Sequence, residues 1–193
     1  MKTTYLLGLC GSLRRASSNA VVMHTLATEL LPAGVQLHLH PLHELPLYNG
    51  DADTDDAPPA VRMLREAVEQ AEGLILGSPE YSHGMSGVMK NALDWLSPPH
   101  RQPLLKGKAI LGFTASPTFT GGSRAQQQLN ETLWAVEANQ VHYPQIVITD
   151  IDSKIRDGRL KDAASRQFLA QGVVALEELI RSKQPLSATL IWA

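Results

Sequence analysis

Residues 5–19, YLLGLCGSLRRASSN, decide the fold, because an apolar run stops abruptly at Gly11 and gives way to a polar loop and then to a helical pattern. The run over residues 5–10 is apolar on both faces, which is typical of a buried strand in a parallel sheet. The pattern that follows repeats every fourth residue from Val22 to Leu30, as one face of a helix does. Strand, loop and helix in this order predict the first unit of an α/β fold.

The same alternation runs through the rest of the chain. We expect five strands, each followed by a helix, at residues 5–10, 35–40, 73–78, 109–115 and 145–149. The second of these, VQLHLH, alternates apolar and polar side chains, which favours an edge strand. The predicted fold is a three-layer α/β sandwich with a five-stranded parallel sheet in the order 2-1-3-4-5 and helices on both faces. In that order the ligand crevice lies at the carboxyl ends of the first and third strands.

Length and composition fit a single domain over residues 1–193. The chain has 44% hydrophobic residues and a formal charge of −2, which gives no general attraction for nucleic acid or for an anionic membrane. No apolar stretch approaches the roughly 20 residues that span a bilayer. Cys10 is the single cysteine, so an intramolecular disulfide or a cysteine metal cluster is excluded. We expect a cytoplasmic protein.

The loop after the first strand is a candidate anion site. A strand-to-helix loop directs backbone N–H groups and the positive end of a helix dipole outward. Its side chains add hydroxyl, amide and guanidinium donors suited to a terminal phosphate, from Ser12, Arg14, Ser17, Ser18 and Asn19. The loop is neither a Walker A motif nor G-x-G-x-x-G. The alternative is that Ser17 or Ser18 only caps the helix while the arginines are solvated.

The loop after the third strand carries the second motif, SPEYSHGMSGVMKNALDW over residues 78–95. Together with GSLRRASSN at residues 11–19, it resembles the NADPH-dependent FMN reductase family, which includes quinone, chromate and azo-dye reductases. LPLYN at residues 45–49 and GGSRAQ at residues 121–126 also resemble that family. The likeness therefore covers four stretches in order between residue 5 and about residue 130. It implies a flavodoxin-like fold, bound FMN, NADPH or NADH as hydride donor, and a homodimer or homotetramer.

The resemblance also implies roles for individual residues. The FMN phosphate would be held by Ser12, Arg14, Ser17 and Asn19. The isoalloxazine ring would be followed along one side by Pro79, Glu80, Tyr81 and Ser82, and approached from the fourth strand by Ser116, Gly121 and Gly122. The chain departs from the family at Ser82 (asparagine there), Gly84 (serine) and Ser86 (proline). His83 and Gly84 are expected to take over part of the ring edge.

The implied activity is transfer of hydride from NAD(P)H through FMN to a small acceptor such as a quinone, a free flavin, an azo compound or chromate. Because flavin N5 does the chemistry, no catalytic side chain is expected. Two alternatives stay open, a flavodoxin-type electron carrier that serves a protein partner and a flavin-less binding module on the same fold. Arg14, Arg15, Lys90 and Arg124 near the loops disfavour the carrier, which usually presents an acidic face.

Four other features have competing interpretations. His38 and His40 lie on one face of the predicted edge strand, and a solvated face is favoured over a metal site, so no metal is expected. Glu80 is expected near the ring or at a subunit contact rather than as a general acid. Tyr81 is expected either to stack near the ring or to pack at a subunit contact. Trp95 is expected in the core or at an interface.

Overall fold

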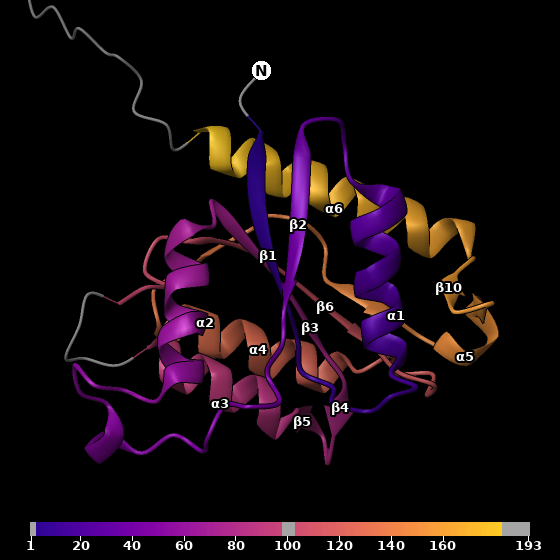
Figure 1. The fold of residues 1–193 in the computed structure, drawn as a ribbon. Helices are drawn as coiled ribbons and strands as arrows, with labels where there is room; N and C mark the ends of the chain where they lie inside the picture. Colours follow the sequence, from indigo (N-terminus) through magenta and orange to yellow (C-terminus); the bar gives the residue numbers. More distant parts are fainter. Residues whose placement is uncertain (1–2, 98–102, 183–193) are drawn as a thin grey trace, which may run out of the picture.

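A computed structural model describes residues 3–97 and 103–182 and contains a parallel sheet between two layers of helices (Figure 1). The strand order is β2-β1-β3-β6, with β7 and β8 both pairing along the outer edge of β6. The bounds of these strands are β1 Thr4–Cys10, β2 Val35–His40, β3 Gly73–Ser78, β6 Ala109–Ala115, β7 Asn139–Gln140 and β8 Ile146–Ile148. This arrangement confirms the predicted order 2-1-3-4-5.

The position of each strand follows its side-chain pattern. All six residues of the central strand β3 are buried, as the uninterrupted apolar run predicts. The alternating strand β2 pairs only with β1, from Thr4 opposite Val35 to Leu9 opposite His40, and is the edge strand. The carboxyl ends of β1, β3 and β6 therefore meet at one edge of the sheet, where the loops that follow them lie together.

Helices cover both faces of the sheet and bury one core on each (Figure 1). They are α1 Ser18–Thr25 with a π-helical extension Leu26–Leu30, α2 Pro59–Gln70, α3 Gly87–Leu96, α4 Ser123–Ala135, α5 Ile151–Lys154 and α6 Ala163–Ser182. The core under α1 and α6 includes Leu6, whereas the core under α2, α3 and α4 includes Leu7 and Leu9. Successive residues of β1 thus point into the cores on opposite faces of the sheet. Within the described residues, no helix combines the length and hydropathy needed to cross a bilayer.

The fifth strand differs from the prediction of one strand over residues 145–149. It is divided into β7 and β8, because Gln140 lies opposite Ile110 and Ile146 lies opposite Phe113. Five residues, 141–145, thus face only two residues of β6, so the chain must bulge away from the sheet. Pro144 has no N–H and cannot donate to the sheet, which favours an interruption here.

Two short hairpins were not predicted. The first joins β4 Glu80–Tyr81 to β5 Gly84–Met85 at the carboxyl end of β3. The second joins β9 Ile155–Arg156 to β10 Arg159–Leu160. An ion-pair network attaches the second hairpin to the end of the first helix, since Glu29 accepts from both Arg159 and Arg166.

Candidate functional site

One serine connects two of the three loops at the carboxyl edge of the sheet. Ser86 Oγ donates to the carbonyl oxygen of Gly11 at 2.6 Å and accepts from the Met89 N–H at 3.1 Å, so it also caps α3. Its own N–H donates to Ser78 Oγ at 3.1 Å. Ser86 is completely buried. The loop after β1 and the loop after β3 are therefore held in a fixed relation.

The loop after β1 offers free hydrogen-bond donors. Within the described part of the chain, no main-chain N–H of residues 12–19 donates a hydrogen bond. Ser17 caps α1 by accepting from the Ala20 N–H at 3.1 Å, and its side chain also forms a hydrogen bond with the Cys10 thiol. The Arg14 side chain is exposed, and Ser12 and Ser18 are half-buried. A cluster of unpaired N–H groups at a helix N-terminus is suited to an anion such as a phosphate.

Asn19 connects the loop after β1 to the end of β6. Its side-chain Nδ2 donates to the Ala115 carbonyl at 2.9 Å, and its Oδ1 accepts from the Ala115 N–H at 3.2 Å. The side chain is buried, so it connects the start of α1 to the end of β6. Asn19 therefore positions the loop after β1, and these two hydrogen bonds use one of the two N–H groups of its amide.

The loop after β3 forms the β4–β5 hairpin, which turns through Ser82 and His83. Both residues have positive φ, 49° and 66°, as the two central residues of a type I′ turn require. Asparagine tolerates this conformation better than serine, which gives a physical reason for the family's asparagine at position 82. Tyr81, Ser82 and His83 are exposed, whereas Pro79 is buried and Gly84 is half-buried.

Glu80 holds the N-terminus of α4. Its Oε2 accepts from the N–H groups of Arg124 at 3.0 Å and Ala125 at 3.2 Å, where the helix dipole favours a negative charge. Its Oε1 lies 3.7 Å from His83 Nδ1, which is 2.6 Å from Arg124 Nη1. The carboxylate is thus turned toward the N-terminus of α4.

The loop after β6 contains a chain of hydroxyls and two adjacent glycines. Ser116 Oγ lies 3.0 Å from Thr118 Oγ1, which lies 2.9 Å from Thr120 Oγ1. Gly121 and Gly122 have φ values of 61° and 93°, which favour glycine. A Cβ at Gly121 would lie 2.6 Å from Val147 Cγ1, so a side chain cannot be accommodated there. The two glycines therefore let this loop pack closely against β8 and the end of β6.

Two further residues, Cys10 and Trp95, lie mainly within the protein interior. Burial raises the pKa of the Cys10 thiol, which disfavours the reactive thiolate. Trp95 is fully buried, its Nε1 donates to the Pro46 carbonyl at 2.8 Å, and of its two predicted places the core is confirmed. Across residues 3–97 and 103–182, no three histidine, cysteine or acidic side chains are placed to hold a metal ion.

The parallel sheet in this order and the loops at its carboxyl edge define a flavodoxin-like protein. The model of the NADPH-dependent FMN reductase family matches residues 4–152, and the chain belongs to that family. An NAD(P)H-dependent FMN reductase of Pseudomonas aeruginosa is 37% identical over 91% of this chain and 94% of its own length. A quinone reductase of Escherichia coli is 34% identical over 90% and 93%, respectively.

A solved structure agrees with this assignment. The flavoenzyme NAD(P)H:(acceptor) oxidoreductase from Paracoccus denitrificans superposes with a TM-score of 0.80 at 29% identity, over 93% of this chain and 98% of that one. The family's cofactor also fits the residues present. A terminal phosphate requires several donors, and the unpaired N–H groups of residues 12–19 supply them.

Reasoning from the sequence missed two residues at the site. The resemblance marks Ser86 only as a departure from the family, whereas the structure shows that it links two loops, and its position just before a helical pattern is a signal for an N-cap. No sequence pattern singles out Gln128, whose Oε1 accepts from the Met85 N–H at 2.8 Å and fixes the hairpin to α4. A contact between residues 43 positions apart leaves no local signal.

Proposed function

We propose that this protein is an FMN-dependent oxidoreductase that takes reducing equivalents from NADPH or NADH and passes them to a quinone. The observation that carries the proposal is the set of unpaired N–H groups at residues 12–19, at the carboxyl edge of the sheet. The names of the Pseudomonas aeruginosa and Escherichia coli relatives supply the donor and the acceptor class.

The loop after β1 would hold the FMN phosphate. Main-chain N–H groups of residues 12–18 would donate to the phosphate oxygens, since none of them donates elsewhere in the described chain. The hydroxyls of Ser12, Ser17 and Ser18 would add three donors, and the exposed Arg14 guanidinium would add a charged one. Asn19 would act indirectly, by fixing the loop to Ala115.

The other two loops would enclose the ring. Bound FMN supplies the chemistry of hydride acceptance and donation, so the protein needs to bind, orient and shield it. Backbone groups of residues 79–84 would follow one edge of the ring, and Ser116 with Gly121 and Gly122 would approach from the β6 side. Main-chain donors near the pyrimidine edge would stabilise negative charge there. Exposed Tyr81 and Phe119 flank the loops and would border the face open to substrates.

The remaining assignments extend the same proposal. We propose a cytoplasmic homodimer or homotetramer folded as one domain, which uses no metal and binds no nucleic acid or membrane. A flavodoxin-type carrier is a weaker candidate, because the exposed side chains of Arg14, Arg15 and Arg124 make the loop region basic.

The test is steady-state oxidation of NADPH and of NADH by the FMN-loaded protein, with a soluble benzoquinone as acceptor. The expected result is quinone-dependent oxidation that needs no added protein partner and disappears when FMN is removed. Oxidation only in the presence of a protein acceptor would indicate the carrier. FMN binding without any oxidation would contradict the proposed enzyme.

A further inference from the structure

One side of helix α4 is exposed and carries aromatic side chains at both ends. The buried side chains of the helix face the core, namely Ala125, Gln126, Leu129 and Leu133. The exposed side chains recur at helical spacing on the opposite side, and we name them the α4 face: Arg124, Gln127, Gln128, Glu131 and Trp134. Trp134 is 79% exposed, and Phe119, just before the helix, is 90% exposed. Aromatic side chains are enriched among the residues that anchor protein–protein contacts.

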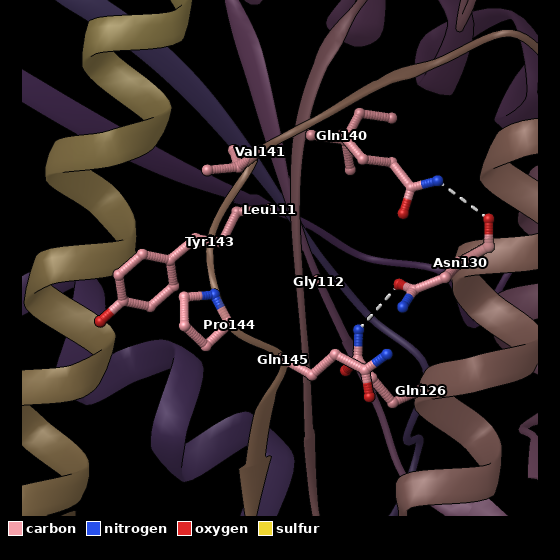
Figure 2. A pocket seen from close by; sticks show the side chains of 10 residues that line it. Leu111, Gly112, Gln126, Asn130, Gln140, Val141, Tyr143, Pro144 and Gln145 are labelled. Carbon is pink, nitrogen blue, oxygen red and sulfur yellow. Dashed lines mark hydrogen bonds between the residues drawn. The ribbon is translucent and has the colours of Figure 1, made fainter.

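One flank of α4 is covered by residues 140–145 of the same chain (Figure 2). Gln126 Nε2 donates to Asn130 Oδ1 at 3.1 Å, and the Asn130 carbonyl accepts from Gln140 Nε2 at 2.9 Å. The hollow that remains between this flank and the bulging chain measures about 60 Å³. It has room for a few water molecules, at roughly 10–15 Å³ each, and not for an element of another chain.

The β4–β5 hairpin covers the other flank of α4. Glu80 accepts from the first N–H groups of the helix, and Gln128 Oε1 accepts from the Met85 N–H at 2.8 Å. A Cβ at Gly84 would lie 2.6 Å from Gln128 Oε1, so the hairpin packs closely on the helix. Because both flanks are fixed by hydrogen bonds, the backbone around the α4 face needs little ordering when a partner binds.

Opposite charges stand at two positions of the α4 face. Arg124 and Glu131 are seven residues apart, which is about 10.5 Å along the helix at ~1.5 Å per residue. Arg124 Nη1 lies 2.6 Å from His83 Nδ1, and Glu131 Oε1 accepts from Gln127 Nε2 at 3.1 Å. Across residues 3–97 and 103–182, neither side chain has an ion pair with an acidic or basic residue. The α4 face is therefore electrostatically complementary to a copy of itself that runs in the opposite direction.

We propose that the α4 face binds the α4 face of a second copy of this chain, with the two helices antiparallel. A two-fold axis at the step from Gln127 to Gln128 places Arg124 of each copy opposite Glu131 of the other, so two equivalent ion pairs form. The antiparallel arrangement also places the positive end of each helix dipole beside the negative end of the other. This proposal rests on the homo-oligomer of the proposed function and names its contact surface.

The aromatic side chains extend the same contact. Seen from the two-fold axis, Trp134 is as far along the helix as Gly121 is in the other direction, so Trp134 of each copy covers the chain just before α4 of the other. Phe119 projects from that segment. It belongs to the loop after β6, which also contains Ser116 and Gly121, so the second copy borders the proposed flavin site on this side.

The test is analytical ultracentrifugation of the full-length, FMN-loaded protein over a range of concentrations at low ionic strength, where exposed ion pairs are least screened. Arg124→Glu and Glu131→Arg are measured singly, combined in one chain, and as an equal mixture of the two single variants. Trp134→Ala removes the aromatic contact. Glu69→Arg, exposed on α2, is the matched control for charge reversal. Circular dichroism and FMN affinity verify that each variant folds.

The expected result is a parent oligomer whose dissociation constant rises about a hundredfold in either single charge reversal, because like charges then face each other at both pairs. The combined variant and the mixture associate again, since each reversed charge meets its complement in the other chain. Trp134→Ala raises the dissociation constant about tenfold. Glu69→Arg associates like the parent protein.

Three results overturn the proposal: a parent protein that stays monomeric, an oligomer that both single charge reversals leave intact, or single variants that dissociate and do not associate when mixed. The second result places the contact of the homo-oligomer on another face. Molecular mass does not depend on hydride transfer, so a failure of the proposed oxidoreductase activity is recognised separately in the assay with NADPH and quinone.

Discussion

The Ser86 hydroxyl joins the loop after β3 to the loop after β1 by donating to the carbonyl oxygen of Gly11, 75 residues earlier, at 2.6 Å. The close approach also requires glycine at position 11, because a Cβ there would lie 2.5 Å from Ser86 Oγ. A proline at position 86, as the family pattern has, would remove both this hydroxyl and the N–H that donates to Ser78. The chain thus uses serine to fix the loops after β1 and β3 together.

Ser86→Ala tests this link. The substitution leaves the buried Gly11 carbonyl without its donor and removes the cap of α3, so the free energy of unfolding should fall by about 1–3 kcal/mol. FMN affinity should fall as well, because the two loops lose their fixed relation. Urea unfolding and an FMN titration measure the two effects. Ser97→Ala, at the opposite end of α3, should change neither property, and equal losses in both variants would contradict the link.

Arg14→Ala tests the phosphate loop. Loss of a charged hydrogen bond should weaken FMN binding by about 1.5–3 kcal/mol. Riboflavin, which lacks the phosphate, should bind the variant and the parent protein equally, and fluorescence titration with both ligands gives the comparison. An equal loss for FMN and riboflavin would mean that Arg14 acts on the ring or on folding.

Ser82→Asn tests the strain in the β4–β5 turn. Asparagine adopts positive φ more readily than serine, so the variant should gain about 0.5–1 kcal/mol in the free energy of unfolding. Ser82→Val, which places a β-branched residue at a φ of 49°, should lose stability. Thermal unfolding of both variants provides the measurement. Destabilisation by asparagine would show that the serine side chain makes a contribution of its own.

The Glu29 network tests the attachment of the β9–β10 hairpin. Hydrogen bonds from Arg166 and Arg159 lower the pKa of Glu29 from the ordinary value of 4.5. Its contribution to stability is therefore fully present above pH 4.5 and is lost as the pH falls through the lowered pKa. Glu29→Gln should flatten the dependence of stability on pH in this acid range, as followed by urea unfolding at several pH values. If Glu29→Gln lost stability at acid pH as steeply as the parent protein does, the Glu29 network would be excluded as the cause of that loss.

The sheet and its helices could be predicted because each strand carries its own signal. Residues 5–10 are apolar throughout and residues 73–78 are apolar up to Ser78, and both segments form buried strands close to the predicted bounds. The division of the fifth strand could not be predicted in this way. Asn139 and Gln140 are polar and lack a strand pattern. Their pairing with β6 depends on the tertiary structure, which places them beside the edge of the sheet.

The location of the candidate site could be predicted from the sequence, but the contacts that its side chains make could not. The loops at residues 11–19 and 79–84 do meet at the carboxyl edge, as topology requires. The partners of individual side chains were missed, since Glu80 reaches Arg124 and Asn19 reaches Ala115 across long sequence separations. The β4–β5 turn was missed because Ser82 and His83 lack the Asn-Gly signature of a type I′ turn.

The most direct test of the central claim is an anaerobic visible spectrum of the purified protein with added FMN, followed by NADPH and then by a quinone. The proposed function predicts that flavin absorbance bleaches with NADPH and recovers in proportion to the quinone added. Failure of FMN to bind would contradict the claim, because the unpaired N–H groups of residues 12–19 would then serve another anion.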